Sequence, residues 1–553
     1  MKKRLPAGLL CWKQPSRRGF IFVFTLVVLM VLTILGLLSI GAAMQTRDIA
    51  ARKERAGRAL LMAEAAAWTA KAYLESLPSP PDPNSIATTP LRYPTDNSWA
   101  AMPAAPTGTL PASVKPIGGK YQAKIYGIAG SSPSRYQVYC YGKSNDGENR
   151  TIVTQIEVAS FSKYAYFENK TLSGAWICTG SRFTGPVHSN DVLPIYWDKS
   201  TGHPIFGDVV TSAQPTVNWY NKPQTDADWR NIFDGGQSAL KLGVKPITIP
   251  ASTLKQKHKA WKGALNLADS TDTGVNPAYP TATGVYLGAN GDTSVSAGIY
   301  IVGNCTMNFQ VDGSGRQQVQ VVQGSTTTTL TIDRATNQTI VTKTGQSQPT
   351  TMSGVPNGMI YCAGGSITAH GTLADNTVSG NMITASNDWT IATDINNYDI
   401  TVDNDLTCTT RPMMKDPNYP SDDSVHPVHR VPITYPTNIK PATLGIYARN
   451  VMIGNTANHP NYEIDAVIMA ANGSSGTWKA ANPNFTYNNQ PGNVYVSGGI
   501  INYQAGLFGY LNGSGQISQG YAEHYYYDPR LGASPPPFFP TTGQLDIETW
   551  QEL

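Results

Sequence analysis

Two groups of side chains in this sequence are of the kinds that bind metals or catalyse hydrolysis. The first consists of His188 and Asp191, with His203 and Asp208 a short way along the chain. An imidazole close to a carboxylate suits metal binding or general base catalysis. The histidine spacing does not match the helical H-x-x-x-H pattern, and no nearby glutamate supplies a base. The glycine, proline, serine and asparagine around His188 are ordinary turn residues, so we predict no catalytic residue here.

The second group lies in the segment His426-Pro427-Val428-His429, which follows the acid pair Asp422 and Asp423. Side chains three apart in an extended segment point to opposite faces, so the two imidazoles converge only if the chain bends at Pro427. The D-x-D-x-D-G pattern of a calcium loop is missing. We predict a solvated loop and no metal site, and whether a metal binds near His426 and His429 stays open.

Sugar binding is a third kind of chemistry, and it needs exposed aromatic rings. The candidates are Trp197, Trp219, Tyr220, Trp229, Tyr521, Tyr525, Tyr526 and Tyr527. The alternative is that these rings cover the core and close the ends of a stack of strands. Hydrolysis of a glycosidic bond also requires two acids that flank it. This chain has few acids, most of them in predicted turns, so we predict that it is not an enzyme and uses no cofactor.

The cysteines are spread along the chain without a C-x-x-C pair, which excludes a zinc ribbon or a thioredoxin-like motif. Cys11 lies near the amino terminus, and the others are Cys140, Cys178, Cys305, Cys362 and Cys408. An odd number in an exported chain implies a free thiol or an intermolecular bridge. Several are expected to be buried as small apolar side chains.

Charged residues make up 14% of the chain, against about a quarter in typical soluble proteins. The formal charge of +4 becomes −2 without the six basic residues of segment 1–19. A chain so close to neutral lacks the clustered basic surface that nucleic acids require. We therefore predict no nucleic-acid partner.

The amino-terminal segment combines a basic leader, Gly19 and an apolar run from Phe20 to Met44. The run is long enough to cross a bilayer, which takes roughly 20 residues. The leader carries no acid, which favours a cytoplasmic amino terminus and a single membrane crossing. An uncleaved anchor that tethers a surface domain is one interpretation.

The residues Arg17-Arg18-Gly19-Phe20 resemble the class III signal of type IV pilins and pseudopilins, in which a prepilin peptidase cuts after the glycine. The resemblance implies processing between Gly19 and Phe20 and a mature chain that keeps its helix. Major pilins carry a glutamate at the fifth mature position, which is Phe24 here. The usual exceptions are minor components, namely PilX-type pilus assembly proteins and the K-type minor pseudopilin. The stretch at 52–66 (RKERAGRALLMAEAA) also resembles the PilX-type amino-terminal region.

The fold class that we predict is α+β and mostly β. A leader at 1–19 precedes a transmembrane and amphipathic helix at 20–77, which ends at the proline-rich segment that begins at Pro78. A linker at 78–119 leads to a small pilin-like antiparallel sheet at 120–161, with strands at 121–126, 136–141 and 151–158. Short apolar runs between glycines and asparagines at 162–553 favour a large right-handed β-solenoid, with a β-sandwich as the alternative. A Thr-rich hairpin is expected at 317–343.

Three further segments resemble a little-characterised domain found behind pilin-like anchors. They are Lys163–Phe167, Gly185–Asn190 and Tyr526–Leu531. This resemblance implies location and architecture, with no activity attached.

Together these features predict a minor pilin-like subunit for assembly, priming or the tip of a type IV pilus or related secretion filament. Its implied partners are other pilin or pseudopilin subunits through the helix, the prepilin peptidase, the inner membrane, and a tip adhesin or surface glycan. The precursor is expected in the inner membrane, and the mature protein in the periplasm or a cell-surface filament. The alternative is a membrane-anchored adhesin or glycan-binding β-solenoid, and an enzyme on that scaffold comes third.

Overall fold

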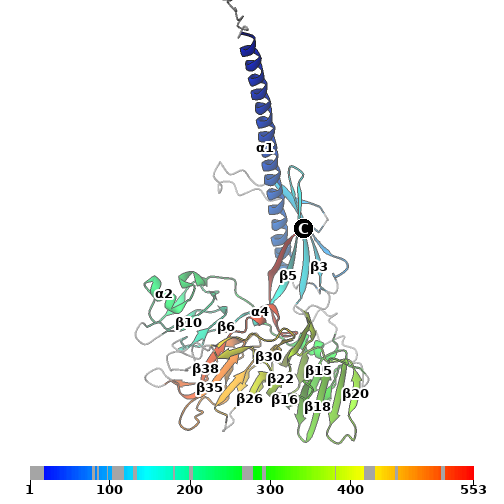
Figure 1. Cartoon of the computed structure of the whole chain (residues 1–553). Helices are drawn as coiled ribbons and strands as arrows, with labels where there is room; N and C mark the ends of the chain where they lie inside the picture. Colours follow the sequence, from blue (N-terminus) through cyan, green and yellow to red (C-terminus); the bar gives the residue numbers. More distant parts are fainter. Residues whose placement is uncertain are drawn as a thin grey trace, which may run out of the picture.

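A long helix leads into two β-rich parts in the computed structural model of this chain (Figure 1). The structure describes residues 18–76, 81, 83, 86–95, 98–101, 118–128, 134–177, 181–198, 203–263, 278–288, 294–379, 382–415, 430–454, 459–511 and 517–553. Residues 1–17 of the predicted leader and much of the predicted linker lie outside this set. So do Cys11, Cys178, Asp422, Asp423, His426 and His429.

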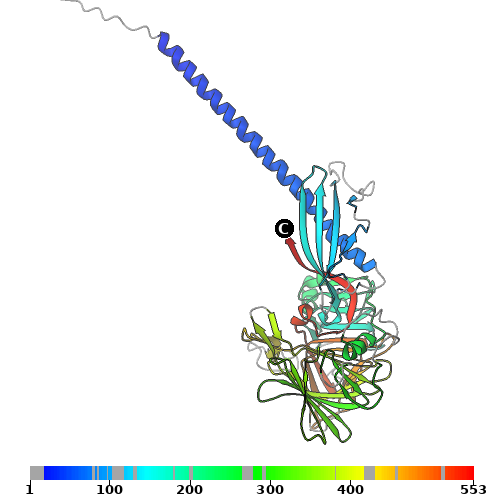
Figure 2. The ribbon, with the colours of Figure 1, turned by 90° about the vertical axis from the view of Figure 1, so that its right-hand side faces the viewer.

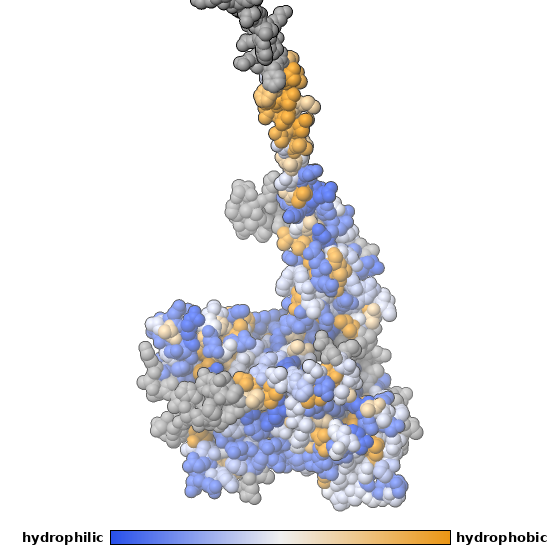
Figure 3. Space-filling view, in the orientation of Figure 1, coloured by the Kyte–Doolittle hydropathy of each residue, from blue (hydrophilic) through white to orange (hydrophobic). Residues whose placement is uncertain are grey.

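Helix α1 (Arg18–Ser76) is continuous over 59 residues. Its first half is apolar and unburied, and it is long and apolar enough to cross a membrane. Figure 3 shows this half as a hydrophobic band that projects away from the rest of the molecule. The predicted long apolar helix is therefore confirmed, and it is compatible with a membrane anchor.

The second half of α1 packs on an antiparallel sheet. Its small residues Ala59, Ala63, Ala66 and Ala70 are fully buried. The helix lies so close to the sheet that a Cβ atom on Gly142 would come within 2.1 Å of the Ala59 carbonyl oxygen. The alanine stripe of the helix thus packs on its own domain.

We call this sheet, with the second half of α1, the head. Its strands follow the order β1-β3-β4-β5-β39, and β2 also pairs with β3. They are β1 (Leu91–Tyr93), β2 (Ala100–Ala101), β3 (Gly119–Gly127), β4 (Arg135–Ser144), β5 (Asn149–Ser160) and β39 (Thr541–Glu552). The three predicted strands fall within β3, β4 and β5, which pair antiparallel.

The carboxyl-terminal strand β39 pairs antiparallel with β5, and Figure 2 shows it along the edge of the head sheet. The predicted division after Phe161 assigns β39 to the larger domain, whereas its hydrogen bonds join it to the head. The larger part is therefore inserted between two neighbouring strands of the head sheet.

In the larger part, residues 162–540, most of the described strands are parallel to their neighbours. We call this whole part the stack. Among the described residues, one sheet has 11 strands in the order β13-β11-β8-β6-β36-β33-β30-β25-β21-β15-β14. These strands are β6 (Tyr166–Lys170), β8 (Val187–Ser189), β11 (Val210–Ser212), β13 (Leu240–Leu242), β14 (Gly284–Tyr286), β15 (Ile299–Val302), β21 (Met359–Ala363), β25 (Trp389–Thr393), β30 (Leu444–Ala448), β33 (Val467–Ala470) and β36 (Gly499–Gln504). Only β14 pairs antiparallel within this described sheet.

The chain enters this sheet in the middle. It begins at β6 and proceeds through β8 and β11 to β13 at one end. It then crosses to β14 and β15 at the other end and returns, strand by strand, to β36. Strand β36 pairs parallel with β6, and we call this pairing the seam. The first and last strands of the sheet in chain order thus lie side by side.

A second sheet of 13 described strands shares a hydrophobic core with the first. Its strands are β16 (Cys305–Val311), β17 (Gln317–Gln323), β18 (Thr326–Asp333), β19 (Gln338–Lys343), β20 (Thr350–Ser353), β22 (Ile367–Leu373), β26 (Ile400–Cys408), β31 (Val451–Ile453), β32 (Asn461–Ile464), β34 (Trp478–Ala480), β35 (Gly492–Ser497), β37 (Gly509–Leu511) and β38 (Ile517–Tyr526). Strands β17, β18 and β19 form an antiparallel meander where the Thr-rich hairpin was expected. The predicted large β-rich region is confirmed.

Smaller elements complete the larger part. The short strands are β7 (Arg182–Phe183), β9 (Leu193–Ile195), β10 (Ile205–Phe206), β12 (Val217–Trp219), β23 (Asn376–Ser379), β24 (Met382–Ala385), β27 (Met413–Lys415), β28 (Arg430–Pro432) and β29 (Ile439–Lys440). The helices are η1 (Phe161–Lys163), α2 (Asp226–Ile232), η2 (Gly236–Ala239), α3 (Leu254–Trp261) and α4 (Arg530–Ala533).

Candidate functional site

The three segments that resemble a little-characterised domain meet at the junction between the head and the stack. The Ala165 N–H donates to the Pro186 carbonyl at 2.8 Å. The Tyr527 N–H donates to the Thr184 hydroxyl at 3.0 Å. A Cβ on Gly185 would lie 2.3 Å from the Tyr527 ring, so this approach requires glycine. These three segments therefore form the junction between the head and the stack, which we call the joint.

Polar contacts fasten the joint to the head at both places where the chain crosses. The Phe161 N–H donates to the Pro540 carbonyl at 3.1 Å. Arg135 on β4 pairs with Glu157 on β5 at 2.5 Å and also donates to the Ala533 carbonyl at 3.2 Å. Beside them, a buried ion pair between Arg530 and Asp528 at 2.6 Å holds α4 in place. Satisfied buried charges of this kind fix a geometry more than they add stability.

His188 lies in the joint as a structural residue. Its ring is buried and stacks on Phe167 with the centroids 5.2 Å apart. Nδ1 is 2.8 Å from the Thr211 hydroxyl, and Nε2 is 2.9 Å from the Asn190 side-chain oxygen. Desolvation lowers the pKa of His188. Both ring nitrogens of His188 are therefore engaged by side chains of the protein itself.

The other three candidates of this group, Asp191, Asp208 and His203, are also hydrogen-bonded or packed within the protein. The Asp191 carboxylate accepts from the backbone N–H groups of Thr171 and Val192 at 3.0 and 2.8 Å. Asp208 accepts from the next N–H in the chain at 2.6 Å. His203 packs 5.0 Å from Trp197, and burial lowers its pKa. Within the described part of the chain, no three His, Cys, Asp or Glu side chains are grouped to hold a metal ion.

An acidic cluster that was not expected from the sequence lies beside the seam. Tyr166 on β6 donates to Glu168 at 2.9 Å, and Tyr525 on β38 donates to Glu523. Burial raises the pKa of Glu168 to about 7 and that of Glu523 to about 8. Each pair joins residues two apart on one strand, which therefore face the same side. The spacing Tyr-x-Glu or Glu-x-Tyr is the feature of the sequence from which these two pairs could have been predicted.

No family model, curated protein or solved structure matched this chain.

Half of the eight predicted sugar-binding aromatics are buried, and three others are partly exposed. Trp197, Trp229, Tyr521 and Tyr526 are buried, which supports the expectation that such rings cover the core. Tyr220 is the most exposed of the eight candidates, because 54% of it is exposed.

Tyr220 directly follows β12 and belongs to a small aromatic cluster. Its ring stacks on Tyr196 with centroids 4.4 Å apart, and Trp176 meets it edge-on at 6.0 Å. Trp176 is 37% exposed. The parallel pairing of β9 with β12 brings Tyr196 and Tyr220 together. We call Trp176, Tyr196 and Tyr220 the aromatic platform, of which the sequence predicted Tyr220 alone.

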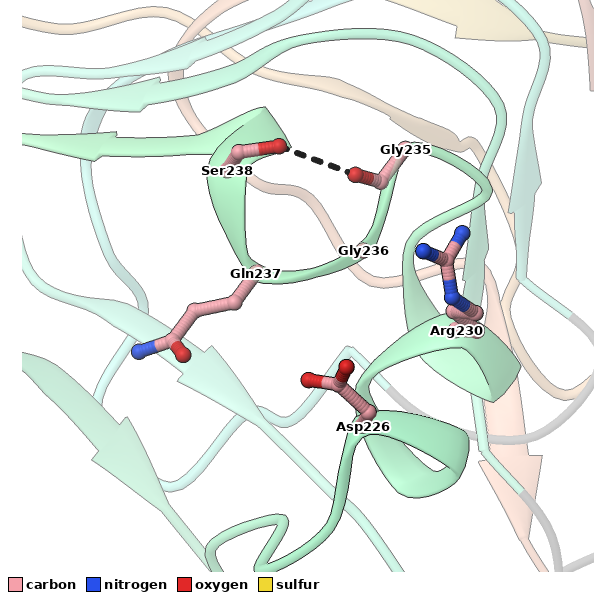
Figure 4. Close-up of a pocket in the computed structure, with 6 residues that line it drawn as sticks. All are labelled: Asp226, Arg230, Gly235, Gly236, Gln237 and Ser238. Carbon is pink, nitrogen blue, oxygen red and sulfur yellow. Dashed lines mark hydrogen bonds between the residues drawn. The ribbon is translucent and has the colours of Figure 1, made fainter.

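A polar hollow of about 440 Å³ lies against α2 and η2. Thr225 and Asp228 form a capping box that starts α2, and Ser238 donates to the Gly235 carbonyl at 3.0 Å. Figure 4 shows the Asp226 carboxylate and the Gln237 amide on facing sides of this hollow. Asp226 is the single acid in the described lining, so the hollow lacks the pair of acids that glycoside hydrolysis requires.

The predicted processing residues lie at the start of α1. The helix begins at Arg18, so Gly19 and Phe20 belong to its first turn. Phe24 follows one turn later and is 63% exposed. Its phenyl ring has no group that can pair with an amine.

Proposed function

We propose that this chain is a minor pilin-like subunit that acts by assembly into a type IV pilus or a related secretion filament, without catalysis. One observation carries the proposal. A single helix of 59 residues is apolar and unburied in its first half, and an alanine-lined second half packs on an antiparallel sheet. An unburied apolar helix needs a membrane or other helices around it.

The mechanism follows from this division of the helix. The basic leader holds the amino terminus in the cytoplasm, and prepilin peptidase cleaves after Gly19. The apolar half of α1 first anchors the chain in the inner membrane and later packs among the helices of other subunits. Because Phe24 replaces the usual glutamate, we place the subunit at the start or tip of the filament, where no earlier subunit needs that carboxylate.

We interpret the stack as a right-handed β-solenoid. In-register parallel pairing from strand to strand supports a solenoid over a β-sandwich, whose sheets are antiparallel. Right-handed crossovers are the general rule for parallel strands. Such a bulky body would be hard to repeat along a tight filament, which also favours the tip.

The test is the intact mass and amino-terminal sequence of the protein from cells with and without prepilin peptidase. We expect a chain that starts at Phe20 only when the peptidase is present. A chain that starts at Met1 in both strains would overturn the proposal.

A glycan-binding surface adhesin is the second candidate function, and the aromatic platform favours it. The C–H faces of sugar rings stack on exposed aromatic rings, and such rings contribute strongly to binding. Co-sedimentation with cellulose and with chitin tests this candidate. We expect the double variant Trp176→Ala and Tyr220→Ala to lose retention at least tenfold, while Trp550→Ala, which alters an exposed ring on the head, retains it. Equal retention of all three proteins, or retention of none, would contradict this function.

A further inference from the structure

Two cysteines face each other across neighbouring coils of the stack. Cys362 on β21 lies beside Ile301 on β15, and Cys305 at the start of β16 lies beside Ile367 on β22. The two segments thus turn the same corner, one above the other. Both cysteines are buried in the interior of the stack.

The corner itself is tightly held. The Gly303 N–H donates to the Ala363 carbonyl at 2.8 Å, and the Cys305 N–H donates to the Ser366 carbonyl at 3.2 Å. The Cys362 thiol donates to the Gly303 carbonyl at 3.2 Å. The Cys305 thiol is also the neighbour that most raises the pKa of Cys362. Both cysteines are free thiols in this structure, and the backbone pairing on both sides brings them to the same corner.

We propose that Cys305 and Cys362 form a disulfide that links two coils of the stack. This rests in part on the proposed function, because disulfides persist in the oxidising compartments outside the cytoplasm. The two thiols lose two protons and two electrons as the S–S bond forms. A disulfide-bearing oxidant of that compartment accepts the electrons by thiol–disulfide exchange and is itself reduced to a dithiol.

The other cysteines are placed differently. Cys140 belongs to the core of the head, and the Cys408 thiol donates to the Ala442 carbonyl at 3.3 Å. Of the four described cysteines, only Cys305 and Cys362 are therefore brought to one corner of the stack.

The surroundings of this pair also set when the bond forms. The neighbouring Cys305 thiol, followed by burial, raises the pKa of Cys362 above its usual value. A thiol with a raised pKa holds little reactive thiolate. The bond must therefore form while the coils assemble. We expect the folded, reduced protein to resist oxidised glutathione, and a refolding chain to react with it.

The experiment maps the cysteines of the full chain isolated from its own cells. The protein is denatured in N-ethylmaleimide without reductant, digested and analysed by mass spectrometry. We expect one cross-linked peptide pair that contains Cys305 and Cys362. In Cys305→Ser, Cys362 should become alkylated, whereas the matched variant Cys408→Ser should keep the link.

A second arm separates this inference from the proposed function. The reduced, denatured chain is refolded in a mixture of reduced and oxidised glutathione and mapped in the same way. If both cysteines are alkylated in the cellular and the refolded protein, the disulfide is overturned. A link in the refolded protein alone supports the pairing and counts against export of the chain.

Discussion

At the scale of single residues, Glu168 makes the stability of the stack depend on pH. Burial raises its pKa to about 7, and the nearby Asp191 adds to the rise, while the hydrogen bond from Tyr166 opposes it. An unfolded glutamate has a pKa of about 4.3. Because the folded value is the higher one, Glu168 stabilises the fold when it is protonated. This contribution is full below the unfolded pKa and is lost as the pH rises through 7.

We therefore expect the free energy of unfolding to fall by about 3 kcal/mol between pH 4 and pH 9 on account of this group. The variant Glu168→Gln should lack that part of the pH dependence. Urea unfolding of both proteins across this range measures the difference. Parallel curves for the two proteins would show that Glu168 does not titrate as described.

At the scale of elements, the approach of α1 to the head sheet depends on Gly142. A Cβ at this position would collide with backbone atoms of α1, at 2.1 Å from the Ala59 oxygen and 2.3 Å from the Ala63 nitrogen. Backbone atoms of a packed helix cannot move aside as a flexible side chain can. We expect Gly142→Ala to cost roughly 1–3 kcal/mol of head stability.

Gly57 provides the matched control, because a Cβ on it meets nothing within 4 Å. Since alanine is the better helix former, Gly57→Ala should stabilise the helix by up to about 1 kcal/mol. Thermal unfolding of both variants tests whether Gly142→Ala lowers the stability of the protein and Gly57→Ala raises it. A neutral Gly142→Ala would mean that the helix packs farther from the sheet.

The elements that the sequence predicted are those encoded locally. The apolar run of α1 and the alternating strands near Tyr121, Tyr136 and Thr151 each carry their own pattern within a few residues. The pairing of β39 with β5 has no such pattern, because Thr154 bonds to Thr549, 395 positions away. The seam and the aromatic platform were missed for the same reason. Both depend on register between strands that are not neighbours in sequence.

At the scale of the whole molecule, the head should fold without the stack. Phe161 and Pro540 are hydrogen-bonded to each other, so the two ends left by removing 162–540 lie side by side. We expect a chain from Gln45 with a short Gly-Ser linker in place of 162–540 to unfold cooperatively on heating. Circular dichroism measures this transition.

A shorter version that also lacks 541–553 serves as the control. It should melt at a lower temperature, because Leu545 is fully buried in the core of the head. If the version with β39 shows no cooperative transition, the head depends on the stack for its fold.

The position of the seam also bears on how such a molecule can change size over evolutionary time. The chain enters the 11-stranded sheet at β6, in its middle, so β13 and β14 at the two ends of this sheet are not joined directly to the head. Duplicating strands at either end would lengthen the body and require only a longer crossing segment. The reach of the protein can thus diversify in two directions while α1 and the head are inherited unchanged.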